Sequence, residues 1–273
     1  RAVGLIWIKE TNPREKLYLE ELGLHAETLE ELSYLILKYP PLFLDNFVGE
    51  KFFSFLSRGA RHSELARELR SLQREKAKSE EILSRFLARG GYASPRQQSL
   101  FAQSVKEYLA FPKERAEQKK GDLFLSLRKY GKAVAAYERA LSKESLDRAT
   151  KSTLLDREGA ALANLFLTER AFDCFQTAYA LRKDRDIVKR MYFLAKSEPD
   201  KALRERFEKE LPTLREAEKE RWDEELRAAK TRAAKGPEVR EVAAILAEQD
   251  AEKRRTLEKK IIAQWREEYR SMV

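Results

Sequence analysis

Two stretches of this chain carry the same pattern of small and aromatic residues, 38 positions apart. Each has a glycine, an alanine twelve positions later, an aromatic residue four after that alanine, and a second alanine three further on. The marks are Gly121, Ala133, Tyr137 and Ala140, then Gly159, Ala171, Phe175 and Ala178. Small residues are needed where two antiparallel helices approach closely, and an aromatic side chain fills the space beside them. The pattern predicts stacked helix pairs, because one pair alone leaves an apolar face uncovered.

The composition agrees with a helical chain. Only 10 of the 273 residues are glycine and 8 are proline, while 42% are hydrophobic and 37% are charged. Good helix formers dominate the remainder. We therefore expect an all-α fold with enough apolar side chains to form a core.

The repeated stretches resemble the tetratricopeptide repeat (TPR) family. The residues that carry the resemblance are Gly121, Phe124, Ala133, Tyr137 and Ala140 in one copy and Gly159, Leu162, Ala171, Phe175 and Ala178 in the next. The resemblance implies a helical-hairpin solenoid, a right-handed superhelix, with extra helices at both ends. The interval departs from the family period of about 34 residues. The family's tryptophan is replaced by Glu117 and Leu155, and its closing proline by Ser145 and Lys183.

Four regions are expected from the patterns along the chain. They are an apolar helical pair at 1–60 with a short strand at 3–8, a basic helical region at 61–112, TPR-like repeats at 113–211, and long charged helices at 212–273. The repeats comprise copies at 114–145 and 152–183 and a degenerate third pair at 186–211.

Helix boundaries follow from periodicity and from turn-forming residues. A helix at 26–38 is expected to begin with a capping box formed by Thr28 and Glu31. Further helices are predicted at 42–56, at 63–89, and at 96–109 with Leu100, Val105 and Leu109 facing inward. Two long C-terminal helices, with Lys235-Gly236-Pro237 between them, complete the prediction.

No motif for catalysis, metal binding or cofactor binding is recognised. The single cysteine, Cys174, has no histidine near it in the sequence, and His25 and His62 are the only histidines. We expect a non-catalytic protein without metal or cofactor. No apolar stretch reaches the length of about 20 residues that a membrane span needs, so a cytoplasmic location without membrane contact is expected.

The TPR resemblance implies a partner-binding groove along the first helix of each pair. The positions that would line it are Arg115, Gln118, Lys119, Asp122, Ser126, Thr153, Asp156, Arg157, Ala160 and Asn164. Gln118, Asp122 and Arg157 stand where some family members hold the lysine and asparagines that clamp a C-terminal carboxylate, so that clamp is not expected. Arg115, Lys119 and Arg157 suit an acidic peptide, or else pair with Asp122 and Asp156.

The leading hypothesis is a protein-interaction scaffold or adaptor that binds a peptide or a partner protein, either in this groove or at the apolar N-terminal helices. An alternative is nucleic-acid binding through residues 58–120, where 15 basic and 8 acidic residues lie, with Arg67, Arg70, Arg74, Lys78 and Arg85 on one long helix. Glutamates alternate with these arginines, and no aromatic platform is present, so nucleic acid is the less favoured partner. A peptide-sensing regulator is a variant of the scaffold. The sequence leaves the oligomeric state open.

Overall fold

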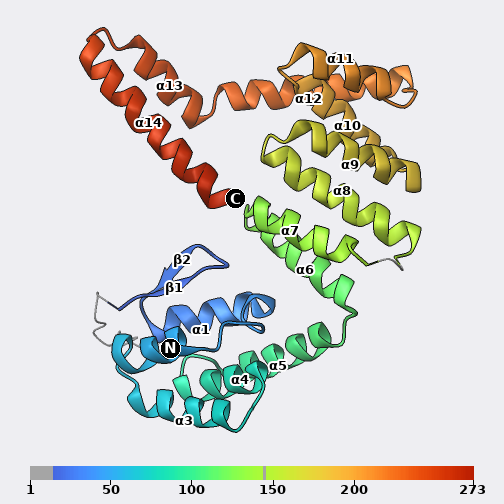
Figure 1. Ribbon diagram of the computed structural model, residues 1–273. Helices are drawn as coiled ribbons and strands as arrows, with labels where there is room; N and C mark the ends of the chain where they lie inside the picture. Colours follow the sequence, from blue (N-terminus) through green and yellow to red (C-terminus); the bar gives the residue numbers. More distant parts are fainter. Residues whose placement is uncertain (1–14, 144–145) are drawn as a thin grey trace, which may run out of the picture. The chain divides into compact units, whose positions relative to one another are not determined.

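The computed structural model describes residues 15–143 and 146–273. In these ranges the chain forms fourteen α-helices, a two-stranded hairpin, and one short 3₁₀ and one short π segment (Figure 1). The predicted all-α class is confirmed apart from the hairpin. Two compact units, residues 1–116 and 117–273, divide within helix α6. The predicted strand at 3–8 falls outside the described residues.

The first unit opens with a β-hairpin that the sequence patterns did not indicate. Strands β1 (Leu17–Leu19) and β2 (Leu24–Ala26) pair antiparallel, and Gly23 supplies a turn residue with φ of 64°. Helix α1 (Leu29–Lys38) follows, and the predicted capping box of Thr28 and Glu31 is present. The hairpin and α1 are therefore joined at a defined helix start.

The helix predicted at 42–56 is wrong for most of its length. The structure has a 3₁₀ turn at Pro40–Leu42, then irregular chain, then α2 (Glu50–Ser54), which continues into a π segment at Phe55–Gly59. Turn-forming Asp45 and Asn46 and an extended Gly49 interrupt the apolar run. Phe43 and Leu44 are still buried, so the run serves the core without being helical.

The helix predicted at 63–89 is two helices. Helix α3 (Ser63–Arg74) ends where Lys76 adopts a φ of 60°, and α4 (Ser79–Gly90) begins after Lys78. The segment between them is charged on every side, so it has no apolar face that would hold it in a continuous helix. Helix α5 (Pro95–Leu109) then packs on α4 and starts with a capping box at Ser94.

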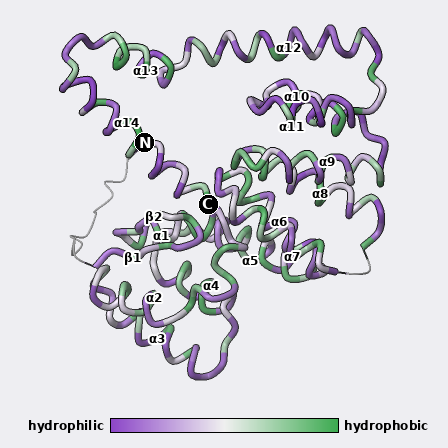
Figure 2. The backbone as a smooth tube through the Cα atoms, turned by 45° about the horizontal axis from the view of Figure 1, so that its top comes forward, coloured by the Kyte–Doolittle hydropathy of each residue, from purple (hydrophilic) through white to green (hydrophobic). Residues whose placement is uncertain are grey.

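The second unit contains consecutive packed helix pairs. Their helices are α6 (Lys113–Ser126), α7 (Tyr130–Leu141), α8 (Arg148–Asn164), α9 (Thr168–Leu181), α10 (Arg185–Ser197) and α11 (Lys201–Glu210). The last two helices lie in the region predicted to hold the degenerate third pair. Figure 2 shows apolar residues interspersed with polar ones along these helices.

The interval of 38 residues also appears in the backbone. Arg128 and Phe166 have φ of 59° and 61° and end equivalent helices. One residue later, the Lys129 amide donates to the Phe124 carbonyl and the Leu167 amide to the Leu162 carbonyl, at 2.9 and 3.0 Å. The two helix pairs therefore share one turn geometry as well as one sequence pattern.

The predicted small residues lie at close helix contacts. A Cβ atom at Gly121 would come within 2.5 Å of the Tyr137 ring, and one at Gly159 within 2.8 Å of the Phe175 ring. Ala133, Ala140, Ala171 and Ala178 are all fully buried. Glycine at 121 and 159 is required because any side chain would overlap the aromatic ring of the paired helix.

Three helices complete the second unit. They are α12 (Glu216–Ala234), α13 (Pro237–Ala247) and α14 (Ala251–Met272). The break at 235–237 was predicted, but the second predicted helix divides again, where Asp250 caps α14. Trp222 of α12 is buried against Val188 and Tyr192 of α10. The end of α14 lies on α7, where Lys129 Nζ donates to the Ser271 carbonyl at 2.8 Å.

None of the helices in the described ranges combines the length and the apolar character needed to cross a membrane.

Candidate functional site

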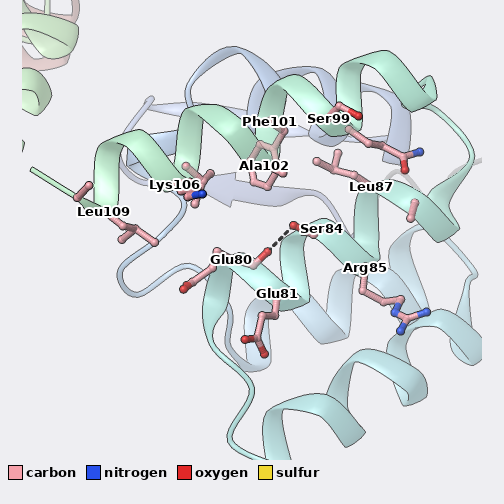
Figure 3. A pocket seen from close by; sticks show the side chains of 14 residues that line it. Glu80, Glu81, Ser84, Arg85, Leu87, Ser99, Phe101, Ala102, Lys106 and Leu109 are labelled. Carbon is pink, nitrogen blue, oxygen red and sulfur yellow. Dashed lines mark hydrogen bonds between the residues drawn. The ribbon is translucent and has the colours of Figure 1, made fainter.

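A groove in the first unit lies between α4 and α5 and has a volume of about 940 Å³ (Figure 3). The two helices run antiparallel, joined by a turn in which Gly91 has a φ of 79°. The buried side chains of Leu87, Phe101 and Val105 form its apolar floor.

Small side chains form much of the groove wall. Ser84 and Ala88 on α4 face Ser99 and Ala102 on α5, and the Ser84 hydroxyl donates to the Glu80 carbonyl at 2.7 Å. Because these side chains are short, the two helices leave space above the floor that another helix backbone can approach. The wall therefore suits an extended or helical ligand better than a compact one.

Charges of both signs stand at one end of the groove. Glu80 and Glu81 lie in the first turn of α4, and Lys106 lies in the last turn of α5. Within the described ranges, none of these three side chains has an ion-pair partner. Arg85 differs, since it lies 3.7 Å from Glu68. The groove thus offers an apolar floor with an acidic rim on α4 and a basic group on α5.

The prediction that Leu100, Val105 and Leu109 of α5 face inward was partly wrong, and the difference affects this groove. Val105 is buried as predicted, whereas Leu100 and Leu109 are 55% and 52% exposed. Phe101, which was not predicted to face inward, takes the buried position. Leu109 lines the end of the groove, so an apolar side chain that the unit does not bury is available to a ligand.

The predicted groove of α6 and α8 is largely occupied by contacts within the chain. Arg157 lies 3.0 Å from Asp122, whose carboxylate also accepts a hydrogen bond from the Tyr137 hydroxyl at 2.9 Å. Asp156 accepts two hydrogen bonds from Arg190, at 2.8 and 3.0 Å. Burial, followed by the charge of Asp122, raises the pKa of Tyr137, and burial raises the pKa of Asp156 despite Arg190.

Most of the other residues predicted to line that groove also contact their own chain. Ser126, Thr153 and Asn164 donate to carbonyls of their own helices, at 2.7, 3.0 and 2.8 Å. Arg115 belongs to the first unit, where its guanidinium lies 4.5 Å from the Phe111 ring centre. Ala160 lies partly buried in α8. The side chains of Gln118 and Lys119 make no polar contact with any described residue.

Ion pairs of this kind join successive helix pairs on both sides of the stack. On the second helices, Arg170 lies 3.1 Å from Glu138, and Arg206 lies 2.7 Å from both Glu169 and Asp173. On the first helices the partners are the Asp122–Arg157 and Asp156–Arg190 pairs. In each of these ion pairs the cation meets a carboxylate of the preceding helix pair.

The half-buried thiol of Cys174 on α9 and the buried carboxyl group of Glu158 on α8 do not form a reactive pair. Burial, and then the charge of Glu158, raises the pKa of Cys174 to about 12, so the thiol stays protonated at neutral pH. Glu158 is only 6% exposed, and burial raises its pKa to about 6. In the described part of the chain no three His, Cys, Asp or Glu side chains gather in a way that would hold a metal ion.

Comparisons of this chain with protein-family models, with curated proteins and with solved structures found no match. The assignment to the TPR family therefore remains a resemblance in the sequence.

Proposed function

We propose that this chain is a non-catalytic protein-interaction scaffold that binds an amphipathic helix of a partner protein in the α4–α5 groove. The observation that supports the proposal is the groove itself, with its apolar floor, small-residue walls and unpaired Glu80, Glu81 and Lys106. Amphipathic helices bind proteins by placing an apolar face in such a groove. The TPR-like helix pairs of the second unit give the scaffold its length.

The groove predicted on α6 and α8 is a weaker candidate for the same role. An acidic peptide would have to displace Asp122 from Arg157 and Asp156 from Arg190 before it met those cations. Breaking a charge pair without replacing all of its contacts is unfavourable. A peptide-sensing regulator that uses this face has the same difficulty.

Nucleic-acid binding through residues 58–120 has less support than protein binding. The single long basic helix on which it depends is divided at Lys76. Arg70 pairs with Glu50, and Arg85 and Arg89 both pair with Glu68. Arginines that are neutralised by neighbouring carboxylates attract phosphates less strongly.

Two matched variants test the proposed site. Ala102→Arg places a long charged side chain in the groove, whereas Ser104→Arg makes the same charge change on α5 outside the groove lining. We expect the first variant alone to lose protein partners in quantitative affinity capture from the native host's lysate, with or without nuclease. Circular dichroism shows whether both variants are folded.

The same capture distinguishes the other sites. If Gln118→Ala/Arg157→Ala loses the partners while Ala102→Arg still captures all of them, the binding site lies on the α6 and α8 face. Recovery that disappears with nuclease would favour nucleic acid and would contradict the proposal.

A further inference from the structure

Helix α14 has an exposed apolar stripe that its own unit does not cover. Ile262, Trp265 and Tyr269 are 43%, 43% and 42% exposed. Their spacing of three and then four residues places them on one face of the helix. Ile261 next to them is buried, so α14 uses one face within the unit and leaves another apolar face exposed. Exposed aromatic stripes of this kind mark interaction surfaces.

Basic residues flank one side of this stripe. The helical turn of about 100° per residue places Lys259 and Arg266 on the same side of Ile262. Arg255 lies on that side one turn earlier. In the described ranges these three cations make no ion pair. The surface therefore combines apolar side chains with uncompensated positive charge.

The stripe has the length that the α4–α5 groove accepts. The groove lining runs from Glu80 to Ala88 on α4, which at a rise of about 1.5 Å per residue corresponds to about two helical turns. From Ile262 to Tyr269 the stripe spans about two turns of α14. Short wall residues in the groove allow the close approach that a Trp anchor needs.

The acidic α4 rim of the groove and the basic side of the stripe are complementary in charge. Glu80 and Glu81 on the α4 rim are unpaired acids, and Lys259 and Arg266 beside the stripe are unpaired bases. From this match in size and charge we infer that α14 of one copy of this chain binds in the α4–α5 groove of a second copy. The inference rests on the proposed function, because it names the helix that the groove receives. Such a contact joins two different surfaces, so it produces either an exchanged dimer or a longer series of copies.

Charge reversal in the chain of residues 1–273 tests the contact. Light scattering after gel filtration and sedimentation velocity over a dilution series measure the mass and the Kd of self-association. We expect the wild-type chain to exceed the mass of a single copy. Glu80→Lys/Glu81→Lys and Lys259→Glu/Arg266→Glu should each weaken association by about tenfold or more. Trp265→Ala should weaken it as well.

The decisive sample combines the two reversals. A chain that carries all four substitutions should associate again, and the two reversed chains should associate with each other when mixed. Lys230→Glu/Lys260→Glu changes the net charge equally on other faces of α12 and α14, and should leave association unchanged.

Several outcomes would overturn the inference. A wild-type chain with the mass of one copy at every concentration would overturn it. A chain with all four substitutions that fails to associate, or a mixture of the two reversed chains that fails to associate, would overturn it too. If the single-copy chain instead sediments with phosphatidylserine vesicles in a Trp265-dependent manner, the stripe serves a membrane surface. If Ala102→Arg still abolishes capture of another protein by a single-copy chain, the proposed function stands and only this inference fails.

Discussion

Gly121→Ala is the sharpest test of the close contact between α6 and α7. The added Cβ would lie 2.5 to 2.8 Å from three atoms of the Tyr137 ring. That ring is fully buried, and its hydroxyl is held by Asp122 at 2.9 Å, so it has little freedom to move away. Overpacking of a core costs about 1–3 kcal/mol, and this contact belongs at the upper end.

The net effect is smaller because alanine is the better helix former. Replacing glycine within a helix gains about 1 kcal/mol, so we expect Gly121→Ala to lower the free energy of unfolding by about 2 kcal/mol. Urea unfolding followed by far-UV circular dichroism measures this change. Gly90→Ala is the control, since nothing lies within 4 Å of its added Cβ, and it should be neutral or stabilising.

A double-mutant cycle shows whether the clash is the cause. In a Tyr137→Leu background the ring is gone, so Gly121→Ala should no longer destabilise the protein and should show the helix-forming gain alone. A loss of about 2 kcal/mol that persists without the ring would refute the reasoning, and so would a Gly121→Ala protein as stable as the wild type.

Two further predictions concern buried groups of the second unit. Glu158→Gln should stabilise the protein at neutral pH, because the rise of the Glu158 pKa from 4.5 to about 6 means that the folded state favours the protonated form. The stability that the protonated Glu158 contributes is fully present below pH 4.5 and is lost as the pH rises through about 6, a change of about 2 kcal/mol. Unfolding at several pH values should show this loss in the wild type and not in the glutamine variant. A glutamine variant with the pH profile of the wild type would contradict the prediction. Phe207→Ala removes a ring stacked 4.2 Å from Phe172 and should cost about 3–5 kcal/mol in chemical unfolding. Phe166→Ala is its control because that ring is 79% exposed; equal losses in the two variants would show that the stacked contact is not what stabilises the pair.

The helix pairs were predictable because their constraint is local and steric. Gly121 and Tyr137 lie in consecutive helices joined by a short turn, so their spacing in the sequence fixes their contact in space. The same holds for Gly159 and Phe175. The capping box at Thr28 was predictable for a similar reason, since its donors and acceptors lie within four residues.

The first unit was harder to predict because its apolar residues lack a regular period. Residues 42–56 are apolar enough for a buried helix, but the chain buries Phe43 and Leu44 from irregular backbone. The α4–α5 groove was not predicted either. Short side chains such as Ala88 and Ala102 give no distinct signal in a sequence, and they become a groove only when two helices set them opposite each other. The one available signal was Leu109, an apolar residue at the end of a helix.

The sequence by itself determined that this chain is helical, where its repeated pairs lie, and which small residues allow those pairs to close. These properties depend on spacing within about 40 residues and on side-chain volume. The tertiary structure decided that Asp122 and Arg157 bind each other, while Glu80, Glu81 and the apolar face at Trp265 stay exposed or unpaired. Whether a charge or an apolar side chain is available to a partner depends on which neighbours the fold brings to it, and that is a property of the packed helices.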